Sequence, residues 1–201
     1  LYSKGALPLA LSRIDELLAE FPHHPALLNL QGTLFTAMND PKRAQKSYEM
    51  SLRNAPSVAD THYRLASAYL QTGRADDAIE HCELALKIQP SDVETHALLC
   101  QCLERCNRLE ELQTAIDRAK NFCGSLQPAI QLREAELLRR SNDLESARRL
   151  LESPIFDASE NSLAAERGYL LGDLCDRMGN SDVAFSNFEA ANQIRAKMPA
   201  T

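Results

Sequence analysis

Cysteine and histidine are the residue types in this chain that could bind a metal ion or carry out acid–base or nucleophilic chemistry. The 201 residues contain six cysteines and five histidines. Cys102 and Cys106 are four residues apart and would share one helix face, which is a spacing that can bind metal. A zinc site needs about four ligands, and no CxxC or HxxxH pair supplies the others. We therefore expect no metal ion, and free thiols in a reducing cytoplasm.

The histidines do not form a catalytic set. His23 and His24 adjoin prolines in a predicted turn, and His81 is expected at a helix surface. His62 and His96 are separated by the length of one helical repeat, which predicts equivalent packing positions in successive repeats. The sequence also lacks a glycine-rich phosphate loop and a GxSxG elbow. We predict that this segment holds no enzyme active site and no cofactor.

A repeat organises the elements that would position these residues. Glycine or asparagine recurs about every 34 residues, and the last two intervals are slightly longer. The recurring residues are Gly5, Asn39, Gly73, Asn107, Asn142 and Gly179. Both residue types tolerate the left-handed backbone conformation that ends one helix and turns the chain. A turn residue at this interval indicates a stacked array of two-helix units.

Small and large apolar residues alternate at helical spacing around each turn. Before the turn, the small position is Gly32, Ala66, Cys100, Ala135 and Gly172, and the large position is Phe35, Tyr69, Leu103, Leu138 and Cys175. After the turn, the small position is Ala10, Ala44, Ala78, Leu112, Ala147 and Ala184, and the large position is Ile14, Tyr48, Cys82, Ile116, Leu151 and Phe188. A small residue lets two helices approach closely, and a large one fills the space beside the crossing. Cysteines at these positions are expected to act as small hydrophobic residues.

The pattern resembles the tetratricopeptide repeat, a helix–turn–helix unit of about 34 residues. The best copy is Ala59–Asp92, with Leu65, Ala66, Tyr69, Gly73, Ala78, Ala85 and Pro90 at the family's positions. The resemblance implies an all-α fold, a right-handed superhelical array of antiparallel helix pairs. It implies repeats at 25–58, 59–92, 93–127, 128–164 and 165–198, after a partial repeat 1–24 that holds a helix over Ala6–Glu20.

The start of the sequence and its net charge limit what kind of protein and which partners are expected. The sequence begins at Leu1, inside a repeat, so we expect a single repeat domain, residues 1–201, that is part of a longer protein. The net charge of −6 disfavours broad nucleic-acid binding, which needs clustered lysine and arginine. No run approaches about 18 apolar residues, so we expect no membrane partner. The later units are longer than the earlier ones, and we expect the array to loosen or bend near residues 153–162.

The resemblance implies a concave groove lined by the first helix of each unit, and hence a protein or peptide partner. The candidate groove residues are Asn29, Thr33, Tyr63, Arg64, Ser67, Gln71, Gln101, Arg105, Arg133, Glu136, Arg140, Tyr169 and Asp173. Arginine forks bind carboxylates through paired hydrogen bonds, so the groove could hold an acidic peptide. Alternatively, the arginines form ion pairs with nearby carboxylates of the chain, for example Arg140 with Glu136, and then indicate no binding site.

Two further functions remain open. Leu171–Asn180 (LGDLCDRMGN) and Val183–Arg195 (VAFSNFEAANQIR) resemble the final repeat that precedes the catalytic domain of bacterial tetratricopeptide-repeat sulfotransferases. This resemblance implies that the segment is a non-catalytic arm that recruits substrate or dimerises, with the sulfuryl-transfer chemistry beyond Thr201. Packing alone also explains most of these residues. The second alternative is a homo-oligomer, in which exposed end faces stack between chains.

Overall fold

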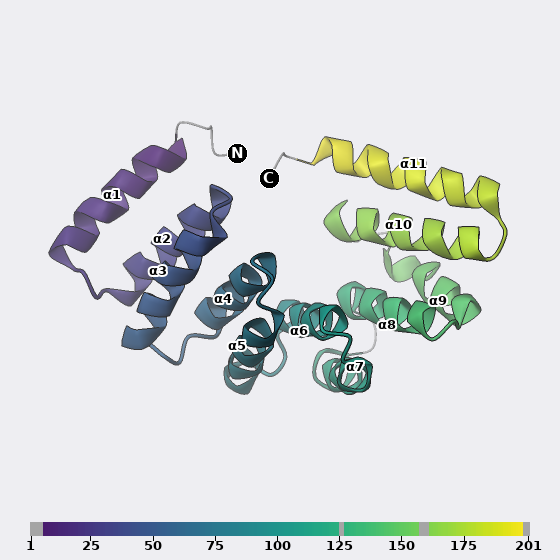
Figure 1. The fold of residues 1–201 in the computed structure, drawn as a ribbon, viewed down its shortest axis with the longest axis horizontal. Helices are drawn as coiled ribbons and strands as arrows, with labels where there is room; N and C mark the ends of the chain where they lie inside the picture. The colour runs from purple at the N-terminus through teal and green to yellow at the C-terminus, as the bar shows by residue number, and fades with distance from the viewer. Residues whose placement is uncertain (1–5, 125–126, 157–160, 199–201) are drawn as a thin grey trace. The chain divides into compact units, whose positions relative to one another are not determined.

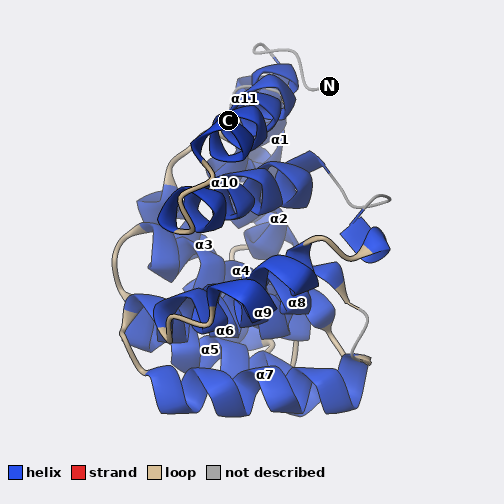
Figure 2. Ribbon diagram, turned by 90° about the vertical axis from the view of Figure 1, so that its right-hand side faces the viewer, coloured by secondary structure: helices blue, strands red, loops and turns tan. Residues whose placement is uncertain are grey.

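The computed structural model describes residues 6–124, 127–156 and 161–198, and every regular element in these ranges is a helix (Figure 2). The predicted all-α class is therefore confirmed. The elements are α1 (Ala6–Glu20), α2 (Pro25–Ala37), α3 (Pro41–Asn54), α4 (Ala59–Gln71), α5 (Ala75–Ile88), α6 (Val93–Arg105), α7 (Leu109–Cys123), α8 (Pro128–Arg140), α9 (Leu144–Leu151), the 3₁₀ helix η1 (Pro154–Phe156), α10 (Asn161–Arg177) and α11 (Ser181–Lys197).

The chain divides into two compact units, residues 1–107 with α1 to α6, and residues 108–200 with α7 to α11. In the first unit, α2 packs on α3 and α4 on α5, and α3 and α5 pack on the helices that follow them. In the second unit α8 packs on α9, and α10 runs antiparallel beside α11 (Figure 1). The division lies between α6 and α7, inside the predicted repeat 93–127. The predicted repeat boundaries themselves stay a prediction.

Each predicted turn residue in the described ranges has the left-handed backbone that the sequence required. The φ angles are 56° at Asn39, 80° at Gly73, 56° at Asn107, 64° at Asn142 and 79° at Gly179. After four of these turn residues, Asn39, Gly73, Asn142 and Gly179, the next residue donates its N–H back into the helix, as Asp40 does to Phe35 O at 2.9 Å and Asn180 to Cys175 O at 2.8 Å. These bonds satisfy carbonyls that a helix end would leave without a donor. Gly5 lies outside the described residues.

The small and large residues of the pattern meet inside a helix pair. A Cβ atom on Gly32 would lie 2.5 Å from the ring of Tyr48, and one on Gly172 would lie 2.5 Å from the ring of Phe188. The small positions Ala66, Cys100 and Ala135 are all 0% exposed. The ring therefore occupies the space that a side chain on the facing helix would need, which fixes the register of the two helices.

The junction between α9 and α10 departs from the regular repeat. Helix α9 ends at Leu151, and the 3₁₀ helix Pro154–Phe156 follows it. Phe156 is buried with Leu132, Leu151 and Leu174 in the core of the second unit. Helix α10 begins at Asn161, before the predicted repeat start at residue 165. The loosening expected near residues 153–162 lies partly outside the described residues and stays a prediction.

The helix beginnings fall into two types. Asp40, Asp92 and Asp143 cap α3, α6 and α9 by accepting the backbone N–H of Arg43, Thr95 and Ser146. Val58 precedes α4 at the position equivalent to Asp92, and its side chain provides no cap. The Thr61 hydroxyl is buried and has no hydrogen-bond partner among the described residues, whereas the equivalent Thr95 hydroxyl donates to Asp92. The valine thus gives the Thr61 hydroxyl no acceptor and provides no side-chain cap for the first turn of α4.

The change Val58→Asp should stabilise the first unit by about 1 kcal/mol, because a carboxylate at this position caps the helix and accepts from Thr61. Val58 is 38% exposed, so little packing is lost. Urea unfolding measures the effect, with Val58→Ala as the control that removes valine without adding an acceptor. Equal unfolding midpoints for the two variants would contradict the capping argument.

The change Gly32→Ala tests the helix crossing. At an ordinary helix position, alanine is more favourable than glycine by roughly 0.5–1 kcal/mol. At residue 32 we expect the opposite sign, a loss of about 1–3 kcal/mol, because the methyl group would overlap the Tyr48 ring. The exposed position Ala37 on the same helix provides the control, where Ala37→Gly should destabilise. Stabilisation by Gly32→Ala would contradict this argument, because it would show that the helix crossing can accommodate a methyl group at residue 32.

Candidate functional site

The predicted groove arginines of the first unit are engaged within the chain. Arg64 pairs with Asp60, with Nε and Oδ2 2.8 Å apart. Arg105 donates from Nη1 to the carbonyl of Leu70 at 2.9 Å, near the end of α4. These contacts match the alternative in which the arginines are partnered in place. Arg105 also ties α6 to the end of α4, since the carbonyls of a last helical turn lack intrahelical donors.

The arginines of the second unit form a denser set of ion pairs between α8 and α10. Arg133 is 7% exposed and binds Glu136 at 2.8 Å as well as Glu166 of α10. Arg139 binds Asp173 of α10 at 3.1 Å. Glu136 and Arg140 also have interactions within the chain. Arg133 and Arg139 therefore hold α8 against α10 through Glu166 and Asp173.

The other predicted groove residues are mostly committed to local hydrogen bonds. Asn29 donates to Asp60 at 3.4 Å, Thr33 donates to the carbonyl of Asn29 at 3.0 Å, and Tyr169 donates to Asn192 at 2.6 Å. Two members are half-buried and one is exposed, namely Ser67, Gln101 and Gln71.

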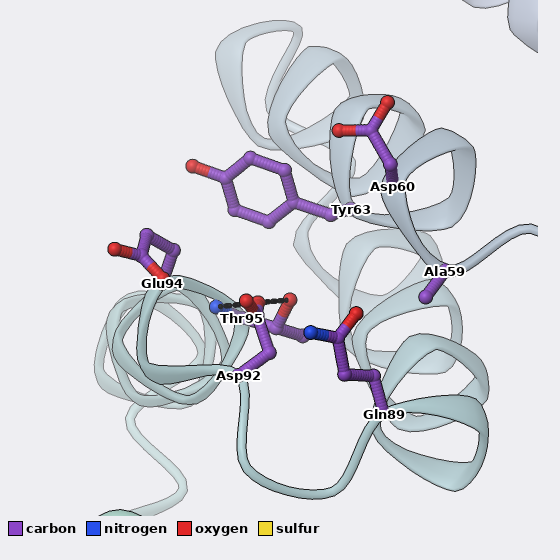
Figure 3. Close-up of a pocket in the computed structure, with 7 residues that line it drawn as sticks. All are labelled: Ala59, Asp60, Tyr63, Gln89, Asp92, Glu94 and Thr95. Atoms are coloured by element: carbon purple, nitrogen blue, oxygen red, sulfur yellow. Dashed lines mark hydrogen bonds between the residues drawn. The ribbon is translucent and has the colours of Figure 1, made fainter.

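A cavity of about 270 Å³ opens between the beginnings of α4 and α6. It is lined by Ala59, Asp60, Tyr63, Gln89, Asp92, Glu94 and Thr95 (Figure 3). We call it the Tyr63 pocket. Among the predicted groove residues only Tyr63 lines it. The sequence analysis did not predict the carboxylates of this pocket, Asp60, Asp92 and Glu94. One signal was present in the sequence: Asp92, three residues before Thr95 and just after Pro90, is typical of a helix cap.

The Tyr63 pocket has a negative electrostatic character. Burial raises the pKa of Tyr63, and the nearby carboxylates of Glu94 and Asp92 raise it further. Asp92 is occupied by the backbone N–H and the hydroxyl of Thr95, and Asp60 by Arg64. Glu94 is exposed and has no partner within the described residues. The pocket therefore combines an aromatic face with one carboxylate that has no internal cation.

The equivalent place one repeat earlier carries different residues, which are joined by a hydrogen bond. Asn29 and Asp60 are the residues that correspond to Tyr63 and Glu94 in the preceding repeat, and the Asn29 amide donates to the Asp60 carboxylate at 3.4 Å. A tyrosine hydroxyl and a glutamate replace that amide–carboxylate pair at the next junction, and a cavity lies beside them. The Tyr63 pocket is therefore a departure from the repeat, which packing alone does not require.

Two of the histidines occupy equivalent buried positions, as predicted. His62 and His96 are 6% and 1% exposed. Their Nε2 atoms lie 2.9 Å and 2.8 Å from the carbonyl oxygens of Pro56 and Pro90. The expectation that His81 lies at a helix surface is wrong. His81 is half-buried, and its Nδ1 lies 2.9 Å from Nδ1 of His62.

The predicted core cysteines Cys82, Cys100 and Cys175 are buried, at 0%, 0% and 4% exposure. Cys102 is equally buried, and its hydrogen bond to Cys82, together with burial, raises the pKa of the Cys82 thiol. Cys106 instead lies at the end of α6, 3.9 Å from Asp76. All six cysteines are free thiols. A raised pKa keeps the Cys82 thiol unreactive.

No helix in the part of the chain that the structure describes combines the length and apolar character needed to cross a membrane.

In both units, antiparallel helix pairs joined by left-handed turns define a helical-repeat protein. The tetratricopeptide repeat family matches residues 29–93. Among solved structures, the Cut9–Hcn1 hetero-tetramer of APC/C has a TM-score of 0.80 with 13% identity, covering 96% of this chain and 40% of that one. These findings support a tetratricopeptide-repeat protein and a solenoid fold.

Two other proteins are similar to this chain. The TPR repeat-containing thioredoxin TTL4 of Arabidopsis thaliana is 26% identical over 204 residues, which cover 95% of this chain. This chain spans only 30% of that relative's length. YrrB, described as a TPR protein with an unusual peptide-binding site, has a TM-score of 0.60 and 16% identity, covering 92% of this chain and 93% of YrrB.

The ion pairs of Arg133 and Arg64 differ in burial and therefore predict different effects on stability. Arg133→Ala should destabilise the second unit by about 2–3 kcal/mol, because it leaves carboxylates without their buried partner. Arg64→Ala should change stability by less than about 0.5 kcal/mol, since its ion pair with Asp60 is exposed. Urea unfolding of both variants tests this difference. Equally small losses would mean that Arg133 is not a structural residue.

Proposed function

We propose that this chain is a protein-interaction scaffold whose Tyr63 pocket binds a basic side chain of a partner protein or peptide. The tetratricopeptide repeats at residues 29–93 support the general role, because stacked helix pairs present extended surfaces to other proteins. The description of YrrB as a peptide-binding protein supports a peptide as one form of that partner.

The observation that carries the specific proposal is the chemistry of the pocket walls. The Tyr63 ring can lie against a cation, which is worth roughly 0.5–2 kcal/mol depending on desolvation. Glu94 is available to form a charge-assisted hydrogen bond with the same cation. A lysine or arginine side chain offers an apolar stem for the cavity and a charged end for the carboxylate. An acidic group would meet Asp92 and Glu94 and be repelled.

An acidic partner, which the groove arginines led us to expect, is the alternative. Arg64, Arg105 and Arg133 already bind groups within the chain. An acidic peptide would have to displace these partners. The free-energy cost is small for the exposed Arg64–Asp60 pair and large for the buried Arg133 pairs. The basic partner requires no such exchange.

The test uses two short fluorescent peptides, one of alternating lysine and alanine and one of alternating glutamate and alanine. We expect fluorescence anisotropy to show binding of the lysine peptide at low salt. Tyr63→Ala and Glu94→Gln should each weaken it by up to about tenfold, as expected for loss of a cation–π contact or a charged hydrogen bond.

The control for net charge is Glu20→Gln, which removes one exposed carboxylate from α1 and should leave binding unchanged. Equal losses of affinity for Glu94→Gln and Glu20→Gln would show that binding depends only on the overall negative charge. Binding of the glutamate peptide, lost on Arg64→Ala, would replace the proposal with the acidic alternative.

The sulfotransferase-arm and self-association hypotheses stay predictions. In the final helix pair, Gly172 packs under Phe188, and Asn192 accepts from Tyr169, so the resembling residues have structural roles. The relatives described above lend no support to sulfuryl transfer. Val183 and Phe185 of α11 are 53% and 69% exposed, and they are the residues through which an end-face contact between chains would form. A cytoplasmic location likewise stays an expectation.

A further inference from the structure

His62 and His81 form a close pair between α4 and α5. Their Nδ1 atoms lie 2.9 Å apart, and the rings stack with centroids 5.2 Å apart. On its other side, Nε2 of His62 lies 2.9 Å from the carbonyl oxygen of Pro56. His62 is 6% exposed, so both of its ring nitrogens are held by protein groups.

The partners of His62 determine where the protons lie. A proline carbonyl can only accept, so His62 carries its proton on Nε2 and donates to Pro56. In the neutral ring Nδ1 is then an acceptor. His81 must therefore carry its proton on Nδ1 and donate to His62, which leaves Nε2 of His81 as the unprotonated nitrogen.

This arrangement has room for one added proton. A proton on Nε2 of His81 leaves the hydrogen bond between the rings intact and gives it a charge. A second proton would have to bind Nδ1 of His62, where it would face the Nδ1–H of His81 at the same short distance. Two donors and two positive charges at this separation repel each other, and burial increases that repulsion.

We propose that the His62–His81 pair is a pH-sensitive lock, which holds α4 against α5 while it binds no more than one extra proton and opens when both rings are protonated. Opening would free His62 from α5 and leave the Pro56 contact as its remaining tie. The lock lies in the first unit and is independent of any partner.

The charged groups around the pair come from three helices. The ring of Tyr69 in α4 stacks on His81 with centroids 5.5 Å apart, and its hydroxyl donates to Glu49 of α3 at 2.8 Å. The Arg74 guanidinium lies over the Tyr69 ring, 4.3 Å from its centroid, and pairs with Asp77. Glu49, Asp77 and Glu80 favour a proton on His81, while burial and His62 oppose it.

Burial and the nearby His62 outweigh the carboxylates, so the pKa of His81 is lowered; burial is the larger cause. The unfolded chain takes up protons at the ordinary histidine pKa of about 6.5. Below that value the unfolded state binds more protons than the folded state, and stability therefore falls as pH decreases. Above it, both states are neutral at His81 and the stability contribution no longer changes.

The direct test is nitrogen-15 NMR of the histidine rings in the full chain at about pH 7.5. We expect His62 as the Nε2–H tautomer and His81 as the less common Nδ1–H tautomer. Finding His81 as the Nε2–H tautomer would overturn the proposal, because neither ring could then donate across the short contact.

The second test compares urea midpoints at about pH 7.5 and about pH 5.5. His81→Asn keeps an N–H donor toward His62 but cannot titrate, so its midpoint should fall less than that of the unchanged chain. His24→Gln, at an exposed position, is the matched control and should reproduce the full fall. An equal fall in all three proteins would also overturn the proposal.

Discussion

The close crossing of paired helices is the constraint on which the rest of the structure depends. In two helix pairs a large side chain on the second helix occupies the space that a glycine on the first leaves open, as Tyr48 does over Gly32 and Phe188 over Gly172. Because a unit buries its apolar face only against its neighbours, this contact sets the register of the pair. The register in turn decides which residues of the first helix meet the preceding unit and which remain at the surface.

The features that the sequence predicted are those that packing repeats. The turn residues Asn39 and Gly73 required a left-handed backbone, and both adopt it. The spacing of His62 and His96 predicted two equivalent buried rings, and both contact a proline carbonyl. Such positions recur, so several copies support each inference. The same reasoning gave the helix crossings, because their residue types are dictated by volume alone.

The features that the sequence did not predict arise where one copy differs from another. His81 was predicted at a helix surface because it directly precedes the core-facing Cys82, but the rings of His62 and Tyr69 stack on it and leave it half-buried. The arginines were read as groove cations, yet Arg105 and Arg133 join successive first helices. A side chain long enough to reach two partners has no fixed role in a one-dimensional pattern. Its role follows from which partner the neighbouring unit offers.

The junctions on either side of the repeat 59–92 show how such differences create a site. Val58 and Asp92 occupy equivalent positions, as do Thr61 and Thr95. Thr95 donates a hydrogen bond to Asp92, whereas the Thr61 hydroxyl has no partner among the described residues. The cap at Asp92 holds a carboxylate at the start of α6, beside the cavity, whereas valine brings no charge to the start of α4. Tyr63 then supplies an aromatic wall at the position where Asn29 donates to Asp60 in the earlier junction. The scaffold thus repeats the backbone of the junction, and the aspartate and the tyrosine that replace valine and asparagine give one copy of it an aromatic wall and a further carboxylate.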